Sequence, residues 1–197
     1  MFFWMGVSNV PASLTSYDAD DAQLMTRLAD GDRSALAELV RRHQRSALEL
    51  AYRTTGDRTL AEDIAQDAFL RVWKSADRYT PTAQFSTWLY RIVVNLCLDV
   101  FKKRKPAAGD LPDGSDLRAE DPTVILERGE RALAVRRAVA ALPERQRIAV
   151  VLQRFSGLSI RGIAEATGAT ESAVESLLVR AHAALRKSLA SLGKNSE

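Results

Sequence analysis

The chain has 197 residues, of which 46% are hydrophobic and 27% charged, and its formal net charge is +3. This composition is that of a folded protein and excludes a chain that is disordered throughout. Its length allows one ordinary domain or two small ones. The single cysteine, Cys97, cannot form an intramolecular disulfide, and no cluster of histidine and cysteine residues has metal-site spacing.

The first 21 residues begin with three apolar aromatic side chains within four positions, but no basic residue precedes them and the apolar run is short. The segment therefore lacks the features of a signal peptide and is too short to span a membrane. We expect residues 1–21 to form a weakly ordered tail and the protein to have no membrane insertion.

Helical periodicity runs from about residue 21 to 77, with breaks at Gly31 and Gly56, each beside an aspartate that can cap the next helix. The helix between these glycines has one apolar face, which predicts ordinary packing. Its charged side chains, among them Arg42 and His43, are expected to form a solvated face.

The next predicted helix, residues 60–73, is apolar on two faces. One face is a core stripe, and the other mixes aromatic, amide and carboxylate groups, which is typical of a protein-docking surface. Two alternatives are burial of both faces within the same domain and a cation held between two aspartates, as in a metal-dependent hydrolase, although the second acidic helix of such a site is missing. The second face consists of Asp63, Gln66, Asp67, Phe69, Leu70 and Trp73.

A loop containing Pro81 precedes a helix that starts at Phe85 and ends in a run of cations, with Cys97 expected to be buried in it. An aromatic, an amide and cations lie along one edge of this helix, and an exposed tyrosine is expected in the loop. Such groups stack on bases, bond to base edges and contact phosphates, as a single-stranded nucleic-acid site requires. The alternative is a core tryptophan beside a solvated helix end. The candidates are Tyr79, Trp88, Arg91, Asn95, Lys102 and Lys103.

Residues 106–126 interrupt the helical pattern. Between positions 106 and 123 there are three prolines, two glycines, five acidic residues and few apolar ones. This composition predicts an acidic linker between two domains, at residues 22–105 and 127–193. Helical periodicity resumes after it, and Pro143 begins another helix that ends near Gly157.

Residues 159–187 have the spacing of a helix-turn-helix. Ala164 is small where two helices must cross closely, Gly168 permits the left-handed backbone that ends the first helix, and Thr170 caps the second. Small polar groups flanked by cations on the outer stripe suit a DNA major groove, although a helical hairpin that only packs is the alternative. The candidate DNA contacts are Ser172, Glu175, Ser176, Val179 and Arg180.

Four segments occur in the order and spacing of the sigma-70 family: AEDIAQDAFLRVW, FSTWLYRIVVNLCLD, LPERQRIAVVL and the helix-turn-helix. Over about residues 22–190 the chain resembles the extracytoplasmic-function (ECF) group of that family. The resemblance implies an all-α protein with two small helical domains, sigma regions 2 and 4, joined by a flexible acidic linker. It also implies a cytoplasmic, non-enzymatic subunit without a cofactor that directs core RNA polymerase to promoters and helps to melt the DNA.

The resemblance also implies roles for the candidate residues. Asp63, Gln66, Asp67, Leu70 and Trp73 would contact the β′ clamp helices of core polymerase. Tyr79, Trp88 and Asn95 would hold a base flipped out of the −10 element, and Arg91, Lys102 and Lys103 would contact phosphates. Ser172, Glu175, Ser176, Val179 and Arg180 would face the −35 element. The polymerase β flap and an anti-sigma factor are further expected partners.

An ordinary DNA-binding regulator, whose first domain senses a signal or dimerises, remains an alternative within the same class of protein. Such a regulator needs no polymerase contact from the second face of residues 60–73. Many members of the sigma family have a basic residue where Glu175 stands, so this glutamate is expected to contribute to specificity more than to affinity, by accepting a hydrogen bond from cytosine.

Overall fold

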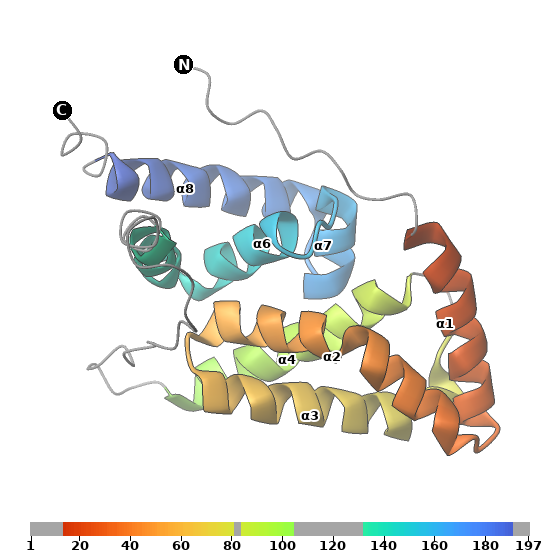
Figure 1. The fold of residues 1–197 in the computed structure, drawn as a ribbon. Helices are drawn as coiled ribbons and strands as arrows, with labels where there is room; N and C mark the ends of the chain where they lie inside the picture. The colour runs from red at the N-terminus through yellow and green to blue at the C-terminus, as the bar shows by residue number, and fades with distance from the viewer. Residues whose placement is uncertain (1–13, 81–83, 105–131, 191–197) are drawn as a thin grey trace, which may run out of the picture.

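A computed structural model describes residues 14–80, 84–104 and 132–190 (Figure 1). Within these ranges the regular structure is helical and contains no β-strand, so the predicted all-α class is confirmed. Residues 132–140 are helical, and the other elements are α1 (Leu14–Ala29), α2 (Arg33–Thr55), α3 (Arg58–Lys74), the 3-10 turn η1 (Ala76–Arg78), α4 (Phe85–Arg104), α6 (Glu144–Arg154), α7 (Ile160–Thr167) and α8 (Glu171–Leu189). The predicted linker at residues 106–126 lies outside the described ranges.

The predicted helix breaks occur at the expected residues. Gly56 ends α2 with a left-handed backbone at φ 75°, and the carboxylate of Asp57 accepts a hydrogen bond from the Leu60 backbone N–H at 3.0 Å. Asp32 caps α2 in the same way, through the backbone N–H of Ser34 at 2.9 Å. These caps satisfy helix-end groups that have no partner inside a helix, which is why the local sequence predicts them.

Helix α1 begins at Leu14, within the predicted tail of residues 1–21, and residues 1–13 lie outside the described ranges. Asp21 of α1 is fully buried, and its two carboxylate oxygens lie 3.1 Å from Arg42 Nη1 and 2.7 Å from His43 Nε2. The solvated face expected for Arg42 and His43 is therefore wrong, because α1 covers it and leaves these side chains only 16% and 15% exposed.

Removal of this buried carboxylate should be costly. We expect Asp21→Ala to lower the free energy of unfolding by about 3 kcal/mol, because it removes the carboxylate that His43 contacts and one of the carboxylates that pair with the half-buried Arg42. Asp20→Ala is the matched control, since the Asp20 side chain is 48% exposed where it pairs with Arg42. Urea unfolding of both variants measures the difference. Equal losses in the two variants would contradict the role assigned to Asp21.

Helix α2 is central to the first helical body and packs against α1, α3 and α4. Burial of apolar side chains from all four helices holds this body together. The fully buried members include Met25, Leu39, Leu50, Val72, Phe85, Leu89 and Val93. Cys97 is buried among them, and burial raises the pKa of its thiol to about 12, so its predicted burial is confirmed. None of the helices in the described ranges has the length and apolar character required to cross a bilayer.

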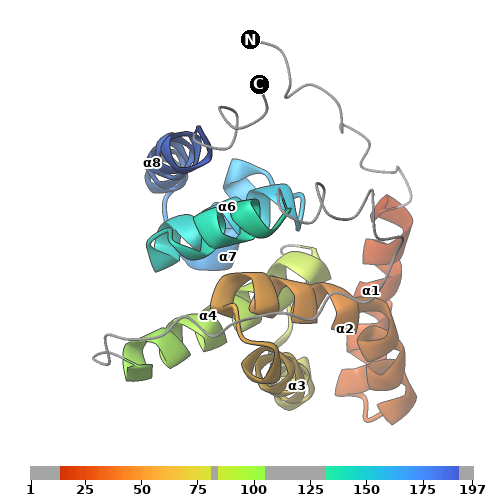
Figure 2. The same ribbon diagram turned by 60° about the vertical axis from the view of Figure 1, so that its left-hand side comes forward.

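Helices α6, α7 and α8 form a second helical body around Ile148, Leu152, Ile163 and Val174. This body lies against the first, with α7 on α4 and α6 on α2, as the two ribbon views agree (Figures 1 and 2). Helix α4 is consequently buried on more sides than a single apolar stripe implies. Tyr90 and Val94 are buried in addition to Phe85, Leu89 and Leu96, which lie on the apolar stripe.

Candidate functional site

The second face of α3 is open to solvent. Asp63, Gln66 and Asp67 are exposed, and so are the large apolar side chains of Leu70 and Trp73, at 48% and 47%. Their spacing along the helix places all five on one side. Neither aspartate forms an ion pair with another residue in the described ranges, and those ranges contain no group of three or more side chains able to hold a metal ion.

The sequence predicts that Phe69 lies on this exposed face, and this prediction is wrong. Its ring is 8% exposed and lines an open groove of about 640 Å³ between α2 and α3. Helix α2 contributes Leu36, Val40, Gln44, Arg45 and Leu48 to the groove, and α3 contributes Glu62, Ala65, Gln66, Phe69 and Leu70. The sequence missed the α2 half, because periodicity assigns Leu36 and Val40 to a core stripe without indicating how far the neighbouring helix covers them.

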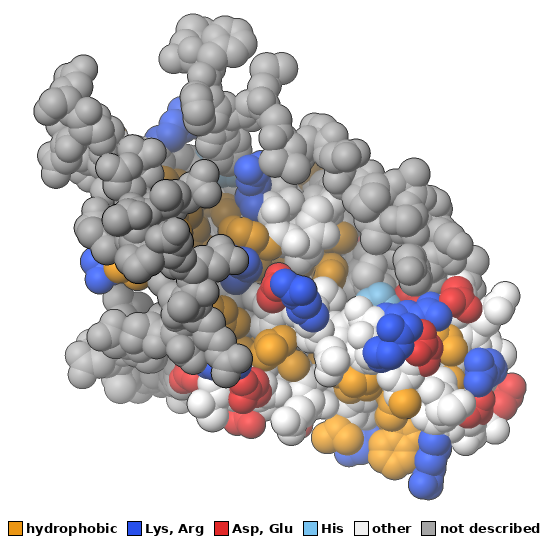
Figure 3. All heavy atoms as spheres, in the orientation of Figure 1, with side chains coloured by type: hydrophobic (Ala, Val, Ile, Leu, Met, Phe, Trp, Pro, Cys, Tyr) orange, Lys and Arg blue, Asp and Glu red, His pale blue; other side chains and the backbone are white. Residues whose placement is uncertain are grey.

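Figure 3 shows how side chains are distributed along α3, at the lower edge of the molecule. Acidic side chains gather near its N-terminal end, and hydrophobic ones gather near its C-terminal end. Carboxylates are favourable near a helix N-terminus, where the macrodipole is positive. A partner helix with basic groups at one end and apolar groups at the other is complementary to this surface.

An aromatic cluster lies between η1 and the start of α4. The Tyr79 ring is 5.1 Å from the Trp88 ring and 6.3 Å from the Phe85 ring, in both cases edge to face. The Phe85 ring in turn lies 4.9 Å from His43. The expectation of an exposed Tyr79 is wrong, because these contacts leave both Tyr79 and Trp88 only partly exposed. The packing fixes the orientation of the two rings that were predicted to stack on bases.

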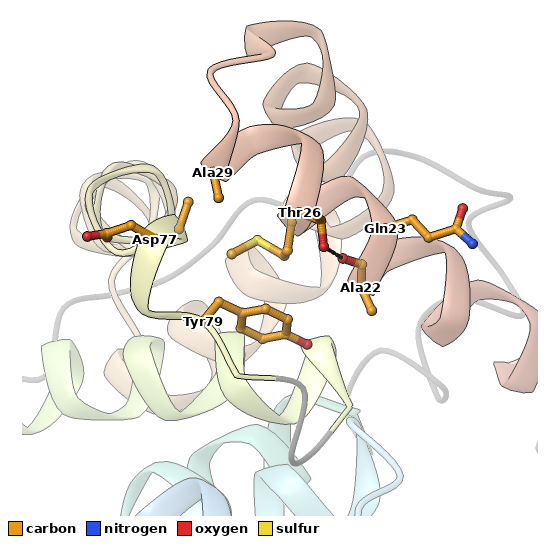
Figure 4. Close-up of a pocket in the computed structure, with 8 residues that line it drawn as sticks. Ala22, Gln23, Thr26, Ala29, Asp77 and Tyr79 are labelled. Atoms are coloured by element: carbon orange, nitrogen blue, oxygen red, sulfur yellow. Dashed lines mark hydrogen bonds between the residues drawn. The ribbon is translucent and has the colours of Figure 1, made fainter.

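Tyr79 also lines a hollow on its other side. A cavity of about 360 Å³ lies between α1 and η1, with Ala22, Gln23, Met25, Thr26, Ala29, Ala76, Asp77 and Tyr79 around it. Figure 4 shows the Tyr79 ring across from Ala22 and Thr26, whose hydroxyl donates a hydrogen bond to the Ala22 carbonyl at 3.1 Å. Helix α1 therefore forms part of the surroundings of Tyr79, which the sequence did not indicate.

Helix α4 continues from Trp88 as a solvent-exposed edge. Arg91, Asn95 and Lys102 are exposed at positions that share one side of the helix, and Lys103 is exposed beside them. The sequence missed Asp99, which lies on the same side and approaches Lys102 Nζ to 3.5 Å. This carboxylate reduces the positive charge around Lys102. Among the cations of this edge, Arg91 lies nearest to the aromatic cluster.

The helix-turn-helix has the predicted geometry. Gly168 ends α7 with a left-handed φ of 67°, and the Thr170 hydroxyl accepts a hydrogen bond from the Ala173 N–H at 3.2 Å. The inner stripe of α8 packs on α6 and α7 through Val174, Leu178 and Ala181. The opposite side is open to solvent, and its exposed members are Ser172, Glu175, Ser176, Val179 and Arg180. Val179, at 68%, is highly exposed for an apolar residue, which is typical of a binding surface.

The stability of the helix-turn-helix should be sensitive to substitution of Gly168 and not of Gly162. We expect Gly168→Ala to lower the free energy of unfolding by about 1 kcal/mol, because a Cβ disfavours the left-handed backbone although the space around it is empty. Gly162→Ala is the control, since Gly162 lies in the helical part of α7, where alanine is favoured. Thermal unfolding followed by circular dichroism distinguishes the two. A loss at Gly162 as large as that at Gly168 would contradict the backbone explanation.

Each of the two helical bodies matches a known protein family. Residues 39–106 match the family model of sigma-70 region 2, and residues 132–185 match that of sigma-70 region 4. The chain is 38% identical over 173 residues to the ECF RNA polymerase sigma factor SigM of Mycobacterium tuberculosis, a match that covers 88% of this chain and 86% of SigM. It is 33% identical over 178 residues to the ECF sigma factor SigW of Bacillus subtilis, covering 82% and 92% of the two chains.

Two solved structures share the arrangement of helices. The structure of CnrH in complex with the cytosolic domain of CnrY is similar at a TM-score of 0.65 and 26% identity, over 90% of this chain and 99% of that chain. The sigma factor RpoE of Bartonella quintana has a similar fold at a TM-score of 0.64 and 20% identity, over 78% and 95% of the two chains. With both region models matched and SigM related over most of its length, the chain belongs to the ECF group of sigma-70 family RNA polymerase sigma factors, which bind core polymerase and direct promoter-specific initiation.

Proposed function

We propose that this sigma factor binds core polymerase, the −10 element and the −35 element through three separate surfaces. The exposed face of α3, with the α2–α3 groove beside it, binds the β′ clamp helices through Asp63, Gln66, Asp67, Leu70 and Trp73. The aromatic cluster and the α4 edge bind the opened −10 element. The outer face of α8 binds the −35 element. Residues 22–105 and 127–193 are the corresponding functional domains, and residues 106–126 are the linker.

The observation that supports the polymerase contact is the exposure of Leu70 and Trp73 beside an apolar groove. A protein that only packed α3 into its own domain would bury both side chains, because exposed apolar surface is unfavourable in water. Central aromatic and aliphatic side chains next to carboxylates are typical of protein-binding surfaces.

In the −10 site, packing prepares the Tyr79 and Trp88 rings for a base that has left the duplex. Extrusion of a base costs a few kcal/mol, and stacking on aromatic rings returns about 1 to 3 kcal/mol per base. Asn95 is exposed on the same side of α4 and supplies a donor and an acceptor for a base edge. Arg91 supplies charge for the backbone. Opening and recognition of the promoter are thereby coupled.

The chain acts as a binding subunit in the cytoplasm and not as an enzyme. An anti-sigma factor restrains it, a proposal supported by the likeness to CnrH, whose structure was solved in complex with the cytosolic domain of CnrY. Run-off transcription with purified core polymerase, with and without the chain, tests the function. We expect transcripts from specific start sites only when the chain is present. Absence of both transcripts and a complex with core would refute it.

Glu175 should determine one base of the −35 element. It is exposed on the outer face of α8, where its carboxylate can accept a hydrogen bond from cytosine N4. We expect Glu175→Ala to change base preference at a single −35 position in a promoter-library selection, by about 1 kcal/mol or more. Glu165→Ala removes an exposed carboxylate from α7 and should leave the preference unchanged. An unaltered preference in the Glu175 variant would dismiss this role.

A further inference from the structure

The aromatic cluster of the proposed −10 site contacts a buried polar pair that the proposed function does not use. The His43 ring lies 4.9 Å from the Phe85 ring, and its Nε2 lies 2.7 Å from a carboxylate oxygen of Asp21. Asp21 is fully buried, and the His43 side chain is 15% exposed. Helix α1, which carries Asp21, is thereby linked to the −10 site through α2.

Phe85 is the ring that His43, Tyr79 and Trp88 all contact. It is 1% exposed, and its centre lies 5.9 Å from that of Trp88 and 6.3 Å from that of Tyr79. Protein interiors are close-packed, so a change in the orientation of a fully buried ring moves the rings that pack on it. The orientations of Tyr79 and Trp88 therefore depend on that of Phe85.

Tyr79 depends on these contacts more than a ring enclosed on all sides would. Its other side borders the cavity of about 360 Å³ between α1 and η1, so close packing does not fix the ring from that direction (Figure 4). Tyr79 and Trp88 are also both only partly buried. Correct placement of the two rings must then come from the buried side of the cluster, where Phe85 and His43 lie.

The polar pair holds the imidazole ring in one orientation. Hydrogen bonds are directional, whereas the hydrophobic effect is not. The second carboxylate oxygen of Asp21 lies 3.1 Å from Arg42 Nη1. Arg42 is fixed in turn by Asp20 at 2.7 Å and by Glu38 at 2.6 Å. Asp21 is thus held on both of its oxygens, and His43 cannot rotate without losing contact with it.

Stability alone is a weak explanation of this pair. Burial of charged groups costs desolvation, and apolar side chains of similar size often replace a buried ion pair without loss of stability. An aliphatic residue in place of Asp21 and a phenylalanine in place of His43 would fill the same space. They would pack against Phe85 but would not orient it, because they form no directional contact.

We propose that Asp21 and His43 are positioning residues of the −10 site. Through Phe85 they hold the rings of Tyr79 and Trp88 where an extruded base stacks. This inference rests on the proposed function for its effect on promoter opening. The orientation of the rings is a property of the free chain and is measured there.

Two variants of Asp21 separate its geometry from its charge. Asp21→Asn keeps an oxygen that accepts from Arg42 and an amide that donates to a neutral imidazole, whereas Asp21→Leu removes both bonds. Because loss of one buried partner destabilises a chain, a double variant with Asp21→Leu and His43→Phe fills the same space with apolar side chains. Leu50→Ala is the control for lost stability, since Leu50 is buried in α2 about 10 Å along the helix from His43.

In the free full-length chain, the indole N–H resonance of Trp88, identified by its loss in Trp88→Phe, reports the surroundings of that ring. We expect this resonance to shift in Asp21→Leu and in the double variant, and to keep its position in Asp21→Asn and Leu50→Ala. Promoter opening, measured with permanganate at saturating chain and core polymerase, should fall about fivefold in the first two variants, the smallest contribution expected from one aromatic–base stack. It should be unchanged in the other two.

The effect should be smaller once Trp88 is absent. In a Trp88→Ala background, Asp21→Leu should reduce opening less than it does in the wild-type chain, because residues that act through one another are not additive. The same reduction in both backgrounds, or an equal reduction in Leu50→Ala, would mean that Asp21 acts only through stability and would overturn the inference. Normal opening in Asp21→Leu and in the double variant would also overturn it.

Failure of the proposed function has a different signature. If Trp88→Ala itself opens promoters normally, the proposed −10 site fails and the effect on opening fails with it. The indole resonance of the free chain still decides whether Asp21 and His43 orient the ring.

Discussion

Replacement of Trp73 by alanine is expected to weaken binding of core RNA polymerase at least tenfold. Trp73 is 47% exposed and lies on the same face of α3 as Leu70 and the two aspartates. Tryptophan is enriched among residues whose truncation costs an interface about 2 kcal/mol or more, because it buries a large apolar area with little loss of side-chain freedom. Fluorescence anisotropy of labelled chain titrated with core polymerase measures the loss.

Arg58→Ala is the matched control for this prediction. Arg58 is exposed at the N-terminal end of the same helix and pairs with Glu62 at 3.1 Å, a surface contact of little energetic value. Both substitutions remove exposed side chains, so neither should change stability by more than about 0.5 kcal/mol. If the two variants bind core polymerase equally well, α3 is not the polymerase surface. An ordinary DNA-binding regulator would then become the better explanation of the fold.

Replacement of Trp88 by alanine should reduce promoter opening by about tenfold to a hundredfold while core polymerase still binds. One aromatic–base stack contributes about 1 to 3 kcal/mol, and Trp88 also holds Tyr79 in place at 5.1 Å. Trp88→Phe keeps an aromatic face and should restore most of the activity. Permanganate reactivity of thymines in the −10 region, at saturating chain and core polymerase, measures opening.

A second variant separates base recognition from packing in the aromatic cluster. Trp88 is partly buried, so its truncation also removes contacts to Tyr79 and Phe85. Asn95 is exposed on the same edge of α4, and Asn95→Ala should impair opening of some −10 sequences without lowering the thermal stability of the chain. Normal opening in Asn95→Ala and Trp88→Ala alike would mean that the −10 element binds elsewhere.

Much of the helical framework followed from local chemistry. Asp32 and Asp57 cap helices because their carboxylates accept hydrogen bonds from backbone N–H groups in the first turn. Gly56 and Gly168 end helices because glycine adopts the left-handed backbone found there. Apart from Phe69, periodicity placed the exposed α3 residues and the outer face of α8 correctly, since residues three or four apart share a helix face.

The candidate surfaces were predicted less completely, because each depends on a neighbouring helix. The α2 half of the groove and the partial burial of Tyr79 arise where two elements meet. The Asp99 carboxylate beside Lys102 differs, because it lies on α4 itself. A helix-period pattern shows which side of a helix is apolar. It does not show how much of that side another element covers.

Except for the start of α1, the sequence by itself determined where these helices begin and end, which sides of them are apolar, and the geometry of the helix-turn-helix, because these depend on residues adjacent in the chain. Only the tertiary structure decided that α1 buries Asp21 against Arg42 and His43, and that Arg147 closes one body onto the other at Thr54, 93 positions away. Contacts of that kind depend on how whole helices stack, and a buried arginine carries the same local pattern as an exposed one.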